Sequence, residues 1–328
     1  MVPETETSSP PTLCVLVPCF NEVEVLEDTA LRLGDLLRQW LRSGLVSNDS
    51  FVLFVDDGSE DRTWVVIRNL VSEVDNFAGL RLGVNAGHQM ALSAGFQAAL
   101  PLCDLFVSID ADLQDDPAVI EAMLRKVSEG AEVVLGVRSD RATDSFYKRA
   151  SASMFYRLSQ SLGVPTVRHH ADFRMMTKGV VQQILASRER KIYWRAAALT
   201  VTQRVATVEY SRQERLKGSS KYTGRKMLVL ALGALTSWSS APLRAISLVG
   251  ISVSTLSFLA LIYVLFSFLV GRTVTGWVSL AASVYFLFGV TIFALGTLGE
   301  YLKQVLEQVR GRPAFHISEQ VGLRESFD

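Results

Sequence analysis

Short apolar runs alternate with amphipathic stretches over the first 140 residues of the chain. Five runs have the length and apolar character of buried strands: residues 13–17, 51–55, 80–84, 105–109 and 133–137. Between them, apolar residues recur at the spacing of one helix face, as Ile120, Met123, Leu124 and Val127 do after the fourth run. Five strand–helix alternations predict an α/β fold with a parallel, doubly wound sheet.

Polar residues follow the predicted strands at their carboxyl ends. They are Asn21 and Glu22, Asp56 and Asp57, Asn85 and His88, and the run from Asp110 to Gln114. Open α/β sheets bind ligands at the carboxyl ends of their strands. We therefore expect these loops to converge on one cleft.

The stretch Asp-Ala-Asp-Leu-Gln-Asp-Asp-Pro at residues 110–117 is the strongest candidate for chemistry. Asp110, Asp112 and Gln114 present oxygen atoms at alternate positions, which suits a hard divalent cation that also holds a diphosphate. Asp116 is placed as the N-cap, and Pro117 as the first residue, of the following helix. An acidic turn that only caps a helix is the alternative, because the motif is short.

The carboxyl-terminal third of the chain has a different character. Residues 204–226 hold seven basic residues against two acidic ones, and an apolar, helix-prone stretch follows at 227–235. Residues 245–270 and 274–298 are then apolar enough, and longer than the about 20 residues needed, to cross a bilayer as helices. Basic residues flank this pair and only Arg272 lies in its turn, which predicts that both ends face the cytosol. The alternative, a pair of core helices, fits these lengths poorly.

Composition agrees with a chain that lies partly in the membrane. The mean hydropathy of +0.25 and the 49% hydrophobic content are high for a soluble enzyme. Lys plus Arg and Asp plus Glu balance at 33 each, so net charge favours no partner, nucleic acid included. Cys14, Cys19 and Cys103 show no metal-ligand or disulfide spacing, which fits a reducing compartment. The first dozen residues lack the features of a signal peptide, so the N-terminal half is expected in the cytosol.

Six motifs then occur in one order: residues 18–22, 56–59, 85–88, 110–114, 172–174 and 210–222. Together they resemble glycosyltransferase family 2, and within it the polyprenyl-phosphate glycosyltransferases related to dolichyl-phosphate mannose synthase. The apolar hairpin and the ending at 299–313 resemble the bactoprenol-phosphate glucosyltransferase branch. The similarity spans about residues 13 to 315. It implies a GT-A fold, a nucleotide-sugar donor, Mg²⁺ or Mn²⁺, and a lipid-phosphate acceptor.

The resemblance also implies roles for individual residues. The donor is bound by Pro18, Phe20, Glu22, Asp56, Asp57, Asn85, Asp110, Ala111 and Asp112. The metal is held by Asp110, Asp112 and Gln114, and the acceptor phosphate by Arg174, Arg212, Arg215 and Lys221. The expected catalytic residues are Asp110, Asp112, Asp172, Arg212 and Lys221.

Several of these roles have alternatives. Glu22 could serve as a charge at a helix N-terminus, and Asp56 could brace its turn. The basic block could bind anionic lipid headgroups. Asp172 could orient the acceptor or act as a general base. His88 is read as structural, and the pair His169 and His170 as loop residues near the site.

The expected reaction needs little from a base, because a polyprenyl phosphate is already an anion at neutral pH. Positioning and charge stabilisation carry the catalysis, and direct displacement inverts the anomeric centre.

We expect transfer of glucose from a UDP-sugar to undecaprenyl phosphate. The alternatives are mannose from GDP-mannose, a non-catalytic nucleotide-binding scaffold, and a processive synthase. Against the last, Trp194-Arg195 reverses the order of the Gln-x-x-Arg-Trp segment of such synthases. Residues 191–195 depart from the family pattern, which leaves the sugar open.

The expected organisation has five parts. Residues 1–12 form a flexible tail, 13–218 the glycosyltransferase domain, 219–240 interfacial juxtamembrane helices, 241–300 two transmembrane helices, and 301–328 a cytosolic tail. The expected location is the inner cell membrane, with the catalytic domain in the cytosol. Assembly into a homo-oligomer through the hairpin is left open.

Overall fold

The computed structural model describes residues 9–138, 170–187, 189, 192–210, 276–311 and 313–323, with single positions between 252 and 270. The chain forms two compact units. The first comprises Met1–Tyr156, Pro165–Lys221 and Pro313–Asp328, and the second comprises Arg157–Val164 and Tyr222–Arg312. The first unit therefore takes chain from both sides of the predicted apolar hairpin.

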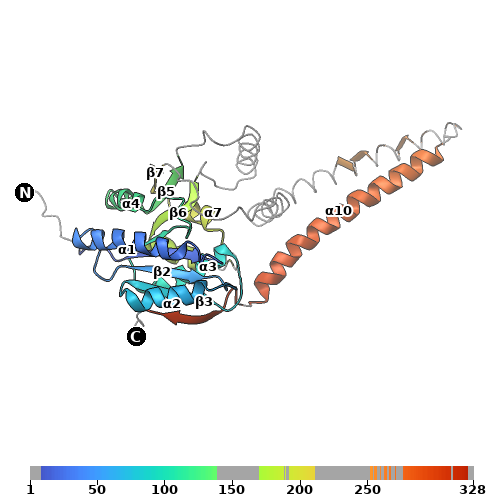
Figure 1. Ribbon diagram of the computed structural model, residues 1–328. Helices are drawn as coiled ribbons and strands as arrows, with labels where there is room; N and C mark the ends of the chain where they lie inside the picture. Colours follow the sequence, from blue (N-terminus) through green and yellow to red (C-terminus); the bar gives the residue numbers. More distant parts are fainter. Residues whose placement is uncertain are drawn as a thin grey trace, which may run out of the picture. The chain divides into compact units, whose positions relative to one another are not determined.

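An eight-stranded sheet in the order β7-β5-β6-β4-β1-β2-β3-β8 is the centre of the first unit (Figure 1). Its strands are β1 (Leu13–Cys19), β2 (Phe51–Asp56), β3 (Phe77–Leu82), β4 (Leu105–Ser108), β5 (Val133–Arg138), β6 (His170–Thr177), β7 (Val205–Tyr210) and β8 (Ile317–Val321). β1 pairs in parallel with β2 and β4, as do β2 with β3 and β5 with β7. β6 is antiparallel to β4 and β5, and β8 is antiparallel to β3. The predicted α/β sheet is confirmed, but it is mixed and not wholly parallel.

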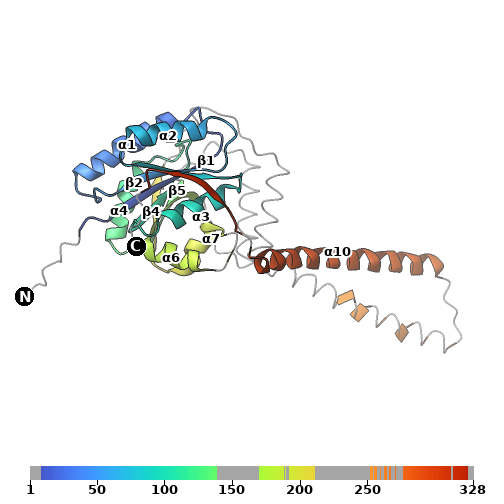
Figure 2. The ribbon, with the colours of Figure 1, turned by 90° about the horizontal axis from the view of Figure 1, so that it is seen from below.

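Helices cover both faces of the sheet (Figure 2). They are α1 (Leu26–Arg42), α2 (Thr63–Glu73), α3 (His88–Ala99), α4 (Val119–Ser128), α6 (Lys178–Ala186) and α7 (Trp194–Val201). Buried residues of α1, α2 and α4 join alternate residues of β1, β2 and β4 in one apolar core. The small residues of α3 let it approach the opposite face, where a Cβ on Gly95 would lie 2.4 Å from Leu16. The rings of Phe96 in α3 and Trp194 in α7 then pack 4.4 Å apart.

The boundaries of some elements differ from those predicted. β3 begins at Phe77 rather than at residue 80. α4 begins at Val119, two residues after Pro117, although Asp116 still accepts a hydrogen bond from the backbone amide of Ala118 at 3.1 Å. His170 is the first residue of β6, so its assignment to a loop was wrong. His169 lies outside the described residues.

Two findings concern the carboxyl-terminal region. β8, at Ile317–Val321, belongs to the sheet, whereas we expected this segment in a tail. α10 (Trp277–Val309) belongs to the second unit and includes most of the predicted second span. The predicted first span, 245–270, falls largely outside the described residues. As far as the described residues reach, none of the helices has the length and apolar character to cross a membrane.

Candidate active site

Strand directions explain why distant loops meet at one edge of the sheet. The parallel strands β1, β2, β3 and β4 all end at that edge. β6 runs the other way, and its Arg174 pairs with Ser108 at the end of β4. The start of β6, with Asp172, therefore lies beside the loop that follows β4. The Ser108 hydroxyl donates to the backbone carbonyl of Asp172 at 2.6 Å.

Asp56 braces the turn after β2, which was one of its two expected roles. Its Oδ1 accepts the backbone amide of Ser59 at 3.0 Å, and Arg81 Nε lies 3.3 Å from its Oδ2. Burial raises the pKa of Asp56, and the bonds from Ser59 and the charge of Arg81 oppose that rise. A donor-binding role remains a prediction for this buried carboxylate.

Asp57 links the loop after β2 to the loop after β3. Its Oδ1 accepts the amide of Ala86 at 2.8 Å, and its Oδ2 accepts the amide of Gly87 at 2.9 Å. Gly87 has a φ of +94° and precedes α3, which begins at His88. Asp57 thereby holds the segment of Asn85 and His88 next to its own loop, as expected for one shared cleft.

The residues after β1 join the same region. Asn21, with a φ of +55°, donates its backbone amide to Ser59 Oγ at 2.9 Å and accepts the amide of Glu60 at 3.0 Å. The backbone amide of Glu22 donates to Thr63 Oγ1 at 3.0 Å. Phe20 is 37% exposed beside them, while Pro18 lies within β1. The predicted donor-binding residues of β1, β2 and β3 are thus brought together.

The loop after β4 carries the predicted metal ligands. Leu113 has a φ of +46°, an unfavourable conformation for a bulky residue of the kind often found at functional sites. The backbone amide of Gln114 donates to Asp112 Oδ1 at 3.3 Å, and Thr29 Oγ1 donates to the carbonyl of Ala111 at 2.6 Å. These bonds tie the loop to itself and to α1.

The electrostatics of Asp110 fit a cation site. Burial raises its pKa, and the nearby carboxylates of Asp172, Asp115 and Asp112 add to that rise, while His88 opposes it. A bound cation would favour the ionised form of such crowded carboxylates. Within the described residues, no group of three or more His, Cys, Asp or Glu residues could hold a metal ion. Two carboxylates and an amide oxygen would therefore leave other positions to donor phosphate and water.

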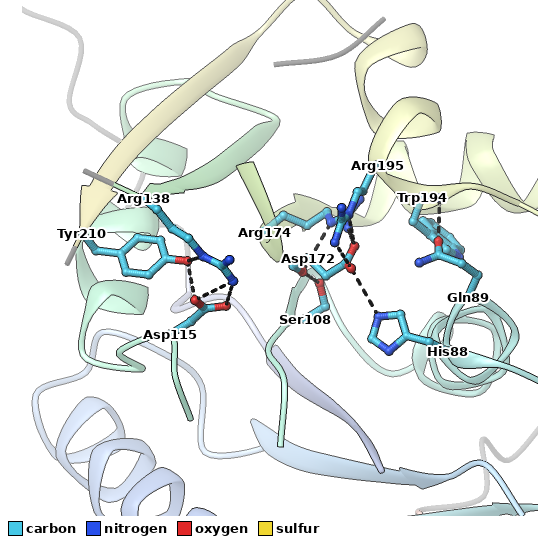
Figure 3. Close-up of polar contacts among 10 residues, drawn as sticks. All are labelled: His88, Gln89, Ser108, Asp115, Arg138, Asp172, Arg174, Trp194, Arg195 and Tyr210. Atoms are coloured by element: carbon cyan, nitrogen blue, oxygen red, sulfur yellow. Dashed lines mark hydrogen bonds and ion pairs between the residues drawn. The ribbon is translucent and has the colours of Figure 1, made fainter. Parts of the chain in front are cut away.

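Asp172 lies among three basic side chains (Figure 3). Arg195 binds it through two bonds, Nε to Oδ1 at 2.9 Å and Nη2 to Oδ2 at 2.6 Å. Arg174 also pairs with Oδ1, and His88 Nε2 lies 3.5 Å from Oδ2. Burial alone would raise the pKa of Asp172, but His88 and the two arginines hold it well below its usual range. So weak a base suits an orienting role better than general-base catalysis.

Arg174 was predicted to contact the acceptor phosphate, but the structure gives it a different partner. Its side chain is fully buried and its guanidinium pairs with Asp172. In this conformation the group supports Asp172 and does not reach an open surface. Contact with a phosphate would require it to move.

Arg195 is a site residue that sequence reasoning did not identify. The start of α7 is anchored on α3, because the amide of Trp194 donates to Gln89 at 3.0 Å (Figure 3). The indole of Trp194 also donates to Ser93 at 2.9 Å. This anchoring places Arg195 on Asp172 while its side chain stays 38% exposed. The one signal was that residues 191–195 depart from the family pattern.

A second polar cluster was also missed. Tyr210 donates its hydroxyl to Asp115 Oδ1 at 2.6 Å, and Arg138 Nη2 lies 3.2 Å from the same oxygen (Figure 3). Burial and the charge of Asp115 raise the pKa of Tyr210. The cluster fastens the ends of β5 and β7 to the loop after β4. Tyr210 also directly precedes the basic block, whose Arg212, Arg215 and Lys221 lie outside the described residues, so their roles remain predictions.

Comparison with known proteins defines the class. Residues 14–185 match the family Glycosyl transferase family 2. An uncharacterised Bacillus subtilis glycosyltransferase, YkoT, is 41% identical over 94% of this chain and 92% of its own length. The SfII prophage-derived bactoprenol glucosyl transferase of Shigella flexneri is 35% identical over 93% of this chain and 97% of its own. Glucosyl-3-phosphoglycerate synthase from Mycobacterium tuberculosis, at 17% identity and a TM-score of 0.47, covers 70% of this chain and 80% of its own, a likeness too distant to inform function.

The chain therefore belongs to glycosyltransferase family 2 and is a glycosyltransferase. More narrowly, it is related to the polyprenyl-phosphate glycosyltransferases, as the motifs indicated.

His88 is expected to make stability depend on pH. Burial disfavours its charged form, but Asp172 and Asp110 outweigh burial and the repulsion from Arg195, so the pKa of His88 is raised. A raised pKa stabilises the fold fully below about pH 6.5, and that stabilisation is lost as the pH rises through the folded-state pKa. We expect the thermal unfolding midpoint, measured in detergent with EDTA, to fall as the pH rises above about 6.5.

The His88→Gln variant should flatten that pH dependence. His316→Gln changes an exposed histidine ahead of β8 and is the matched control, expected to keep the wild-type slope. Equal slopes for His88→Gln and the wild-type protein would contradict the assignment.

Proposed function

We propose that the protein transfers glucose from a nucleoside diphosphate sugar, UDP-glucose, to a polyprenyl phosphate at the cytosolic membrane surface. The observation that carries this proposal is the similarity to bactoprenol glucosyl transferases over more than nine-tenths of the chain. The site supports it, because it combines carboxylates suited to a cation with an arginine-rich cluster beside them. No feature of the described site favours mannose or a guanosine donor.

The chemistry divides between two sides of the proposed site. Asp110 and Asp112, with Gln114, would hold Mg²⁺ or Mn²⁺, which supplies neutralising charge for the departing diphosphate. On the other side, Asp172 fixes Arg195, and the partly exposed guanidinium offers donors suited to phosphate oxygens. The acceptor phosphate is already ionised and attacks the anomeric carbon directly, which inverts it. Asp172 orients its neighbours and moves no proton.

The path of the chain supports a hairpin in the membrane. β7 precedes the two apolar stretches and β8 follows them, yet both strands belong to one sheet. A chain that leaves and returns to the same domain must cross a bilayer an even number of times. We therefore propose two crossings, at residues 245–270 and 274–298, with the sheet in the cytosol and the basic block at the membrane surface. Assembly through this hairpin remains a further proposal.

Cysteine labelling tests this topology. Cys14, Cys19 and Cys103 are buried, so a membrane-impermeant maleimide should label the native protein little. Thr273→Cys lies in the turn between the apolar stretches. We expect it to react when the reagent reaches the outer side of an inner membrane that is still sealed. Gln320→Cys, exposed on β8, should react only after the membrane is permeabilised. Labelling of both positions from the same side would contradict the two-crossing arrangement.

A transfer assay tests the activity itself. Purified full-length protein, undecaprenyl phosphate and Mg²⁺ would be incubated with radiolabelled UDP-glucose, and separately with UDP-galactose and GDP-mannose. Label from UDP-glucose is expected in the lipid fraction. The anomeric configuration of the lipid-linked glucose should be opposite to that of the donor. Transfer from GDP-mannose alone would replace the proposed donor, and no transfer from any donor would favour a scaffold.

A further inference from the structure

The strand β8 is built closely into the sheet. The amide of Gly83 donates to the carbonyl of His316 at 2.9 Å just before the strand. Along it, Glu319 pairs with Arg81 and Val321 with Gly79. A Cβ on Gly79 would lie 2.9 Å from Val321 Cγ2, so only glycine admits this approach. The segment after the apolar stretches is therefore a constituent of the domain that holds the site.

Glu319 connects β8 to the side chain of Arg81. Its Oε2 accepts the indole N–H of Trp64 at 3.0 Å, and its Oε1 lies 3.4 Å from Arg81 Nη1. The Arg81 guanidinium also lies 5.9 Å from the centre of the Trp64 ring. Glu319 and Trp64 thus hold the outer side of this guanidinium.

The inner side of Arg81 faces the proposed nucleotide end of the site. Its Nε lies 3.3 Å from Asp56 Oδ2, and the Asp56 side chain is fully buried. Among the described residues, this Oδ2 atom has no hydrogen-bond partner, so Arg81 supplies its compensating charge. The other oxygen of Asp56 holds Ser59, and Ser59 Oγ holds Asn21. A continuous set of contacts therefore runs from β8 to the loops after β2 and β1.

We propose that β8 is a positioning element for the donor nucleotide, in which Glu319 orients Arg81 and Arg81 fixes Asp56 and its turn. The proposal rests on the proposed function and on the expected donor-binding roles of Asp56 and Asp57, which would put the nucleotide at these loops. It assigns a role in donor affinity to the segment that follows the apolar stretches. Arg81 and Glu319 act through Asp56 and need not touch the donor.

Binding of UDP and of GDP with Mg²⁺ to the full chain in detergent, measured by calorimetry, tests the proposal. Arg81→Ala leaves Asp56 buried without compensating charge, and we expect its UDP affinity to fall about tenfold, equivalent to about 1.4 kcal/mol. Glu319→Ala removes a partly exposed partner, and a fall of about threefold is expected. Gln320→Ala, exposed on the same strand, is the matched control and should bind as the wild type does. In turnover assays the donor KM should rise while kcat changes little.

A double-mutant cycle separates positioning from general stability. If Glu319 acts through Arg81, Glu319→Ala should weaken UDP binding no further in the Arg81→Ala background. If Arg81→Ala does not fold, Glu319→Ala and Glu319→Gln test the proposal alone. Glu319→Gln keeps the bond to Trp64, so its UDP affinity should lie between those of Glu319→Ala and the wild type. Variants that bind UDP as tightly as the wild type, or effects that multiply in the cycle, overturn this inference only. Wild-type protein that binds neither UDP nor GDP overturns the proposed function, and this inference with it.

Discussion

Asp112→Ala is expected to lower kcat for sugar transfer by about a hundredfold to a thousandfold while the fold remains intact. Asp112 and Asp110 lie in one short loop after β4, and the carboxylate of Asp110 is already crowded by others. Removing one carboxylate removes a ligand of the proposed cation, and the departing diphosphate then loses its neutralising charge. Raising Mg²⁺ to saturation should restore little, because the missing ligand lies on the protein.

Asp116→Ala provides the matched control in the same loop. Asp116 pairs with Arg32 at 2.9 Å and accepts the amide of Ala118, and it is not one of the proposed metal ligands. Its loss removes one partly exposed ion pair and one hydrogen bond, so it should cost about 1 kcal/mol of stability and leave turnover near the wild-type value. Both variants should be compared by circular dichroism and by initial rates at several Mg²⁺ concentrations. Near wild-type turnover for Asp112→Ala would refute the metal assignment.

The sequence predicted five strands of the sheet because their apolar runs are local signals. It did not predict that the sheet is mixed. β6 reads His-Ala-Asp-Phe-Arg-Met-Met-Thr, and its direction depends on the path of the chain before it. β8 is short, with Ser318, Glu319 and Gln320 exposed, so its pattern resembles that of a polar tail. Its strand conformation depends on pairing with β3, more than 230 residues earlier.

At the candidate site, too, the features that depend on local sequence were predicted and those that depend on distant segments were not. The residues after β1 to β4 were predicted to meet because they directly follow strands, and the structure brings them together. Their partners come from distant segments whose positions no local pattern specifies. Arg195 reaches Asp172 only because β6 is antiparallel and α7 is anchored on α3. Arg138 and Tyr210 meet Asp115 only because β5 and β7 end side by side.

Asp172→Ala is expected to have the largest effect on stability of any single change at the site. The fully buried guanidinium of Arg174 and the partly exposed Arg195 would both lose their carboxylate. Breaking a buried ion pair from one side costs about 3–5 kcal/mol, because the remaining charge is left without compensation. Since the pKa of Asp172 is lowered, its stabilisation is present above about pH 4 and is lost only as the pH falls further. The variant should therefore be less stable than the wild type at neutral pH and approach it in acid.

Asp35→Ala is the control, because Asp35 pairs with Arg38 at 2.6 Å on the exposed surface of α1. Its loss should change stability by less than about 1 kcal/mol. Asp172→Asn keeps the side-chain shape and one acceptor, so it should fold better than Asp172→Ala and still misplace Arg195. If Asp172 orients Arg195, transfer by Asp172→Asn should be low at every pH, and Arg195→Ala should add little to the loss. A general base would instead act without Arg195, so Arg195→Ala alone would leave transfer near the wild-type value. Wild-type stability for Asp172→Ala at neutral pH would show that these charges are not coupled as the structure indicates.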